Sequence, residues 1–195
     1  MYTIFTPVGQ AGWKCWRLTC VLEAEVEEVT SVLMDYDKAV TWNPALTKTQ
    51  VLARPDEELM LTYQVTLVML LSYYWQFLIS LTLQVTAGQR PFVSQRDFTF
   101  LVSSVMEDGV WVAGGTSLNL PSHPPTERYV RAWQHPTCME VRPREGAQGQ
   151  TVFTWLLQCD FGGLLPVSLL NMVMPYCIKL FTASLKKHLK KNKKQ

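Results

Sequence analysis

A long stretch without charged side chains limits what this chain can fold into more than any other feature. Residues 59–89 contain no Asp, Glu, Lys, Arg or His. Within this stretch, Leu67–Leu83 is apolar enough to cross a bilayer as a helix. Such a segment has to be buried either in a membrane or against other parts of the protein. The charges on its two flanks do not decide between these two locations.

The order of residues inside this stretch favours strands over a spanning helix. Met60–Thr66 and Ile79–Thr86 both alternate apolar and polar side chains, which is typical of a half-buried strand. The sequence of Leu61–Thr66 is also closely similar to that of Leu81–Thr86, twenty residues later. We therefore interpret the region as a strand duplicated around an insertion, and a membrane anchor at Leu67–Leu83 stays open as the alternative.

Composition predicts one cytoplasmic domain over residues 1–195 and excludes several classes of protein. Hydrophobic residues make up 48% of the chain, which excludes intrinsic disorder. Five cysteines without a C-x-x-C pair indicate reduced core thiols, and the three histidines are too scattered for a metal site. We expect no catalytic residues because no G-x-S-x-G motif is present. We also expect no cofactor.

The basic residues are concentrated at one end of the chain. The last ten residues contain six lysines, whereas residues 1–60 carry nine acidic and five basic side chains. The body lacks the extended basic face of a nucleic-acid-binding protein, so no nucleic-acid partner is expected. The lysines indicate either a solvated helix end or contact with an anionic membrane.

Alternating segments predict a meander of antiparallel strands after an initial strand and helix. A strand over 13–22 leads into a helix at Glu23–Asp35, which the Trp42-Asn43-Pro44 sequence ends. Further strands are predicted at the following segments: Lys48–Ala53, Met60–Thr66, Phe98–Met106, Val110–Leu120, Tyr129–Gln134, Cys138–Arg142 and Thr151–Asp160.

After Gly162-Gly163 the apolar period changes to about 3.6 residues, which predicts a long terminal helix. Its apolar stripe is predicted to contain Leu169, Val173 and Cys177. Pro175 lies inside this pattern, so we expect a kink or a break there.

Several short blocks together resemble one family, the START lipid-transfer domains. They occur in the family's order and spacing: Trp42-Asn43-Pro44, Ser94-Gln95-Arg96-Asp97-Phe98, Tyr129-Val130-Arg131-Ala132, His135-Pro136-Thr137-Cys138-Met139, Thr154-Trp155-Leu156-Leu157 and Gly162-Gly163-Leu164-Leu165-Pro166. The resemblance covers roughly residues 13–62 and 87–189. It implies an α+β helix-grip fold, in which a curved antiparallel sheet wraps a long C-terminal helix and encloses a tunnel for one lipid.

The chain departs from the family pattern in three respects. The family's N-terminal helix has no counterpart before the first strands, and an atypical hydrophobic insertion occupies about 67–86. Sterol carriers of the family resemble one another in a buried acid–base pair. At the matching positions this chain has Gln64, or its echo Gln84, and Val102.

The resemblance implies non-vesicular binding and transfer of a sterol or a phospholipid by a monomer that touches membranes only transiently. We expect Arg131 to be the polar anchor of the lipid, or else to pair with an acid such as Asp160. Arg96 and Asp97 are expected to form a structural ion pair at a strand end, with a role in lipid binding as the alternative. Gly162-Gly163 is expected to be a hinge. An insertion isoform without transfer activity stays open as an alternative. The tunnel wall is expected to contain Trp111, Trp133, Trp155, Leu157, Phe161, Leu169, Met172, Val173, Cys177 and Phe181.

Overall fold

The computed structural model describes residues 3–5, 15–66, 94–163 and 167–193. Its helices are α1 (Val26–Met34), α2 (Ala39–Trp42) and α4 (Val167–Asn192). Its strands, in chain order, are β1 (Thr3–Phe5), β2 (Trp16–Leu22), β3 (Leu46–Ala53), β4 (Leu59–Thr66), β5 (Arg96–Glu107), β6 (Val110–Ser117), β7 (Val130–Arg131), β8 (Trp133–Gln134), β9 (Thr137–Pro143), β10 (Thr151–Leu157) and β11 (Cys159–Asp160).

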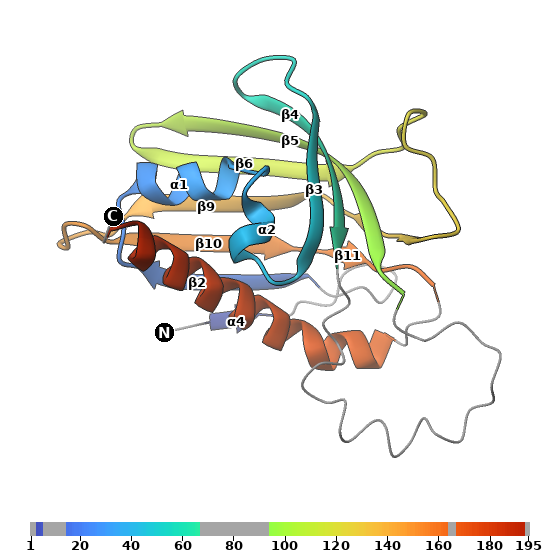
Figure 1. The fold of residues 1–195 in the computed structure, drawn as a ribbon. Helices are drawn as coiled ribbons and strands as arrows, with labels where there is room; N and C mark the ends of the chain where they lie inside the picture. Colours follow the sequence, from blue (N-terminus) through green and yellow to red (C-terminus); the bar gives the residue numbers. More distant parts are fainter. Residues whose placement is uncertain (1–2, 6–14, 67–93, 164–166, 194–195) are drawn as a thin grey trace.

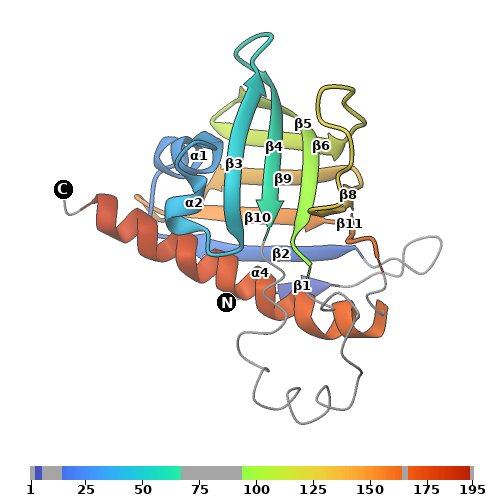
Figure 2. The same ribbon diagram turned by 45° about the vertical axis from the view of Figure 1, so that its right-hand side comes forward.

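The strands form one curved sheet in the order β1-β2-β10-β9-β6-β5-β4-β3, and all neighbours along this path are antiparallel. Short turns connect β3 to β4, β5 to β6 and β9 to β10, which is why these neighbours in sequence are also neighbours in the sheet. Figure 2 shows that β3 and β4 run steeply across the direction of β2, β9 and β10, so the sheet bends around an interior.

The long helix α4 covers one side of this interior, and α1 and α2 lie close to its C-terminal half (Figure 1). Val26, Val29 and Val32 form the buried face of α1. Glu28 stabilises the start of α1, because its carboxylate accepts a hydrogen bond from the backbone N–H of Glu25 (2.8 Å). The fold is therefore the predicted α+β helix grip.

The predicted elements differ from the observed ones in a few places. The Tyr129–Gln134 segment is not one strand but two short ones, β7 and β8, and β7 pairs parallel with β5. The strand predicted to reach Leu120 ends at Ser117. Helix α4 continues through Pro175 as one helix of 26 residues, so the predicted break does not occur. Helix α2 and strand β1 were not predicted.

The predicted duplicated strand and the predicted membrane anchor both fall in residues 67–93, outside the described residues. Thr66 and Arg96, on either side of that gap, are partners in the β4–β5 ladder. Among the helices that the structure describes, none combines the length and the hydrophobicity required to cross a membrane.

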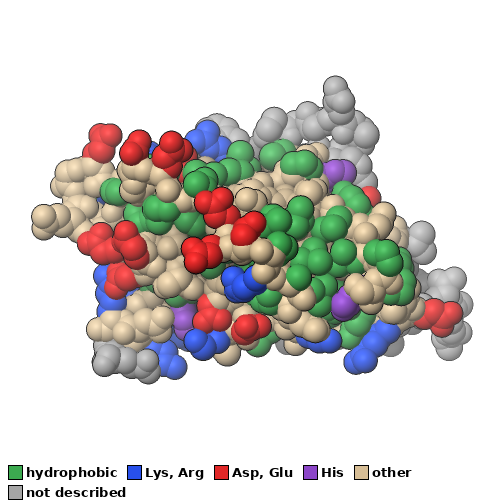
Figure 3. Space-filling model, turned by 90° about the horizontal axis from the view of Figure 1, so that it is seen from above, with side chains coloured by type: hydrophobic (Ala, Val, Ile, Leu, Met, Phe, Trp, Pro, Cys, Tyr) green, Lys and Arg blue, Asp and Glu red, His purple; other side chains and the backbone are tan. Residues whose placement is uncertain are grey.

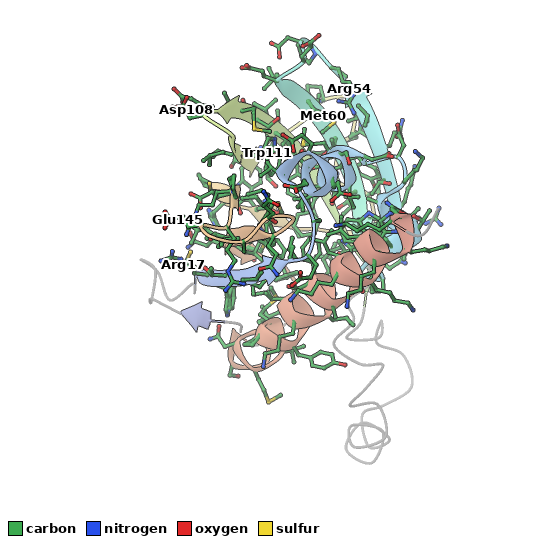
Figure 4. The ribbon with its side chains drawn as sticks, turned by 90° about the vertical axis from the view of Figure 1, so that its left-hand side faces the viewer. Arg17, Arg54, Met60, Asp108, Trp111 and Glu145 are labelled. Carbon is green, nitrogen blue, oxygen red and sulfur yellow. The ribbon has the colours of Figure 1, made fainter. Side chains whose placement is uncertain are left out.

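The surface mixes charged and apolar areas. Viewed from above, acidic side chains cluster beside an extended apolar area (Figure 3). Trp111 and Met60 lie inside the molecule, whereas Asp108, Glu145 and Arg17 lie at its margin (Figure 4).

Candidate functional site: an apolar cavity under the C-terminal helix

A cavity of about 260 Å³ lies between the concave face of the sheet and helices α1, α2 and α4. Its described lining consists mainly of aromatic, aliphatic and methionine side chains. The residues that line it are Leu33, Met34, Tyr36, Ala39, Trp42, Asn43, Ala45, Leu46, Gln64, Thr66, Phe98, Phe100, Val102, Trp111, Ala113, Gly114, Gly115, Gln134, Thr137, Met139, Trp155, Leu157, Cys159, Phe161, Leu170, Met174, Cys177, Ile178 and Phe181. A concave site of this composition is suited to an apolar ligand.

Strand alternation explains how the sheet supplies this wall. Successive strand residues point to opposite faces, so Phe98, Phe100 and Val102 of β5 share the concave face. Their partners across β4 include Gln64, which is opposite Phe98. On β6, Trp111, Ala113 and Gly115 alternate along the strand and line the same cavity, as does Gly114.

Aromatic rings from the sheet and from α2 contact α4 at one end of the cavity. The Phe181 ring of α4 lies 4.8 Å from the Trp155 ring and 5.4 Å from the Trp42 ring, measured between centroids. At the other wall, Phe161 meets Phe98 edge to face at 6.3 Å. These tilted and edge-to-face arrangements are the favourable ones for aromatic pairs.

A buried ion pair lies on the face of β4 and β5 that points away from the cavity. Asp97 is 1% exposed, and both of its carboxylate oxygens accept hydrogen bonds from Arg131 at 3.0 and 2.9 Å. The Tyr63 hydroxyl also donates to Asp97 at 3.2 Å. Burial, and then the Asp97 charge, raise the pKa of Tyr63 to about 12. Arg131 additionally donates to the carbonyl of His123.

This network corrects two predicted pairings. Arg131 does pair with an acid, but the acid is Asp97 and not Asp160. Arg96 does not pair with Asp97, because the two are consecutive strand residues and point to opposite faces. Arg96 is instead buried with its guanidinium donating to the carbonyls of Phe161 and Ser94.

Six of the residues predicted for the tunnel wall line the cavity: Trp111, Trp155, Leu157, Phe161, Cys177 and Phe181. Trp133 does not, because its neighbour Gln134 faces the cavity and consecutive strand residues face opposite ways. Arg131 is held by Asp97 and is not part of the lining. The side chain of Leu169 lies outside the described residues.

The rotation of α4 differs from the predicted one. Met172 is 63% exposed, and Val173 is buried without lining the cavity. The residues of α4 that do line it are Leu170, Met174, Cys177, Ile178 and Phe181. The first half of α4 is apolar on most of its circumference, so the apolar period alone did not determine which stripe faces the sheet.

The two glycines before α4 occupy backbone conformations that other residues adopt only with strain. Gly162 and Gly163 have φ angles of 60° and 70°. A Cβ at Gly162 would lie 2.8 Å from the carbonyl oxygen of Arg131. Gly163 lies beside the Arg96 guanidinium. The glycines therefore let the chain pass close to β7 before the helix begins.

The wall formed by β4, β5, α1 and α2 was not predicted from the sequence. The signal for part of it was present, because Phe98, Phe100 and Val102 recur at every second residue. Gln64 and Val102, which the resemblance placed at the positions of a buried acid–base pair, both line the cavity. No comparable periodic signal marks Tyr36 and Trp42, which lie near helix ends.

Two thiols of the described residues line the cavity, and burial raises the pKa of both Cys159 and Cys177. They therefore act as small apolar groups and not as nucleophiles. Within the described ranges, no cluster of three or more His, Cys, Asp or Glu side chains could hold a metal ion.

Comparison with known proteins gives a consistent result. The family profile of the START domain matches residues 1–195. The chain is 29% identical over 164 residues to the mitochondrial steroidogenic acute regulatory protein of Gallus gallus, covering 83% of this chain and 51% of that protein. For the protein of Mesocricetus auratus the identity is 27% over 177 residues, covering 90% and 56%. The chain thus spans about half the length of these curated relatives.

Solved structures share the fold. The human StAR-related lipid transfer protein 5 superposes with a TM-score of 0.78 at 20% identity, covering 97% of this chain and 86% of that one. The Zhui aromatase/cyclase superposes with a TM-score of 0.52 at 10% identity, covering 90% of this chain and 93% of that one. At these identities the likeness concerns the fold alone.

Proposed function

Because this chain belongs to the START domain family, we propose that it binds one lipid in the cavity under α4 and transfers it between membranes. The observation that carries this proposal is the cavity itself, which is apolar on the sheet side and on the helix side. A lipid that buries several hundred Å² of apolar surface there would gain on the order of 10 kcal/mol before entropic costs. The proposal involves no catalytic step.

The lipid needs a way in, and we propose that α4 moves away from the sheet at a membrane surface. The movable part would be the segment around Gly162-Gly163, with the aromatic contacts of Phe181 to Trp42 and Trp155 breaking as the cavity opens. These contacts join α4 to α2 and to β10, so their loss would uncover the cavity from one side.

The outward side of α4 has features that suit contact with a membrane. Met172 and Tyr176 are both exposed apolar residues one turn apart. Exposed lysines follow at Lys179, Lys187 and Lys190. Apolar side chains followed by basic ones match the two requirements for binding at an anionic interface, which are apolar insertion and attraction to phosphate groups.

Transfer of a fluorescent lipid from donor to acceptor vesicles tests the function. The protein should accelerate transfer in proportion to its concentration, and no acceleration with any lipid class would contradict the proposal. A disulfide joining α2 to α4 tests the opening movement in the same assay. The oxidised protein should be inactive and the same preparation after reduction should be active. Equal rates before and after reduction would refute the movement of α4.

A further inference from the structure

One buried cation of this protein has no acidic partner. Arg96, the first residue of β5, is 2% exposed. It takes part in none of the ion pairs between described residues. The residues outside the described ranges contain no Asp or Glu, so they cannot supply a carboxylate side chain either. The charge of Arg96 is therefore buried without a counter-charge.

Neutral groups surround the Arg96 guanidinium. Asp97 follows it in β5, but that side chain points to the opposite face of the sheet and pairs with Arg131. Within the described ranges, the guanidinium donates only to the backbone carbonyls of Phe161 (3.2 Å) and Ser94. Burial lowers the pKa of Arg96, which means that its surroundings disfavour the charged form.

The guanidinium lies beneath the segment that leads into α4. Phe161, whose carbonyl it binds, is followed directly by the two glycines. A Cβ at Gly163 would lie 3.7 Å from the Arg96 Nη2 atom, so the guanidinium also lies next to that glycine. The residues that cover the cation are thus the ones that we propose to move when α4 leaves the sheet.

Arg96 cannot follow such a movement, because its backbone is held in the sheet. It pairs with Thr66 of β4 and with Val130 of β7. When α4 and the segment Phe161–Gly163 move away, the guanidinium stays behind and meets water. Keeping an unpaired ion out of water is strongly unfavourable, and hydrogen bonds to neutral carbonyls offset only part of this cost.

We propose that the unpaired charge of Arg96 favours the open position of α4, because the cation is dehydrated only while the cavity is closed. This inference rests on the carrier function and the helix movement proposed above, and it names a group that makes the movement easier. Arg96 is not among the described residues that line the cavity, so this role requires no contact with the lipid.

Three substitutions separate the charge of Arg96 from its hydrogen bonds. Arg96→Lys keeps the charge, Arg96→Gln keeps a donor without the charge, and Arg96→Met removes both. Hydrogen–deuterium exchange of the lipid-free full chain reports opening at the backbone amides of 167–175. These amides should exchange about tenfold more slowly in the Gln and Met variants than in wild type, and within about threefold of wild type in the Lys variant. Exchange in α1 should be unchanged in all three variants.

Thermal unfolding provides a second comparison, with Arg131 as the matched control. Both arginines are largely buried, but only Arg131 has an acidic partner. Arg96→Met should keep or raise the melting temperature, whereas Arg131→Met should lower it by several degrees. In the vesicle assay, the Gln and Met variants of Arg96 should transfer lipid about tenfold more slowly than wild type, in line with their slower opening.

Several results would overturn the inference. Exchange of 167–175 in Arg96→Met that equals or exceeds that of wild type would show that the charge does not favour opening. Failure of both uncharged variants to fold would mean that the charge stabilises the closed form. Absence of lipid transfer by the wild type would instead refute the proposed carrier function, and the exchange measurement, which uses no lipid, would still decide the role of Arg96.

Discussion

The two glycines before α4 allow a sharp test of the observed geometry, because they share one property and differ in another. Both have a left-handed φ, of 60° at Gly162 and 70° at Gly163. Only at Gly162 would an added Cβ meet backbone, at 2.8 Å from the carbonyl oxygen of Arg131. The atoms nearest to a Cβ at Gly163 are side-chain atoms at 3.5 Å or more.

The expected costs follow from these contacts. A left-handed φ costs an L-residue roughly 1–2 kcal/mol, and the loss of unfolded-state freedom returns about 0.4–1 kcal/mol. Gly163→Ala should therefore lower the free energy of unfolding by about 1 kcal/mol. Gly162→Ala adds a backbone collision that forces a local shift, with an additional cost of about 1–3 kcal/mol. Its total destabilisation should be about 2–4 kcal/mol.

Urea unfolding followed by tryptophan fluorescence measures both values, with wild type and both variants compared at the same pH. The melting temperature of Gly162→Ala should also fall by several degrees more than that of Gly163→Ala. Equal destabilisation of the two variants would refute the close approach of Gly162 to Arg131. Full stability of Gly162→Ala would also refute the left-handed conformation.

Three further perturbations test other parts of the structure. Arg131→Met leaves the buried Asp97 carboxylate without its partner and should lower the free energy of unfolding by about 3–5 kcal/mol. Lipid retention by the folded fraction should stay unchanged. A decrease of less than about 1 kcal/mol in urea unfolding would contradict this expectation. Because the folded state keeps the Tyr36 proton above pH 10 and the unfolded state loses it, stability should fall as pH rises from 10 towards 12. Tyr36→Phe should make that fall shallower in thermal unfolding between pH 9 and pH 12, and identical slopes would count against the burial of this hydroxyl. Met172→Asp should leave stability within about 0.5 kcal/mol of wild type, whereas Val173→Asp should reduce it severely, and the reverse order would mean that α4 is rotated differently.

The fold could be predicted largely because its signals are local. The alternation in Phe98–Met106 and Thr151–Asp160 indicated strands, and the change of period after Gly163 indicated the terminal helix. Short elements such as α2 carry too few residues for a periodic signal. Pro175 does not end α4, since packing against the sheet outweighs one lost backbone hydrogen bond.

The cavity could be predicted only in part, because it depends on contacts between distant segments. The sequence alone does not show whether Arg131 pairs with Asp97 or with Asp160, since both acids lie in strand segments. The partner is determined by the parallel pairing of β7 with β5, which joins residues 34 positions apart. The rotation of α4 likewise depends on its packing against the sheet, and the mostly apolar first half of the helix leaves it ambiguous.

Native mass spectrometry of the purified chain most directly tests the claim that this interior holds a lipid. Wild type should carry one lipid per chain. A variant that fills the cavity, Ala113→Phe, should carry none, while circular dichroism shows the same secondary structure, because Ala113 is buried on the cavity wall. A wild-type protein that stays free of lipid after exposure to mixed sterol and phospholipid vesicles, or equal lipid loading of both proteins, would contradict the account.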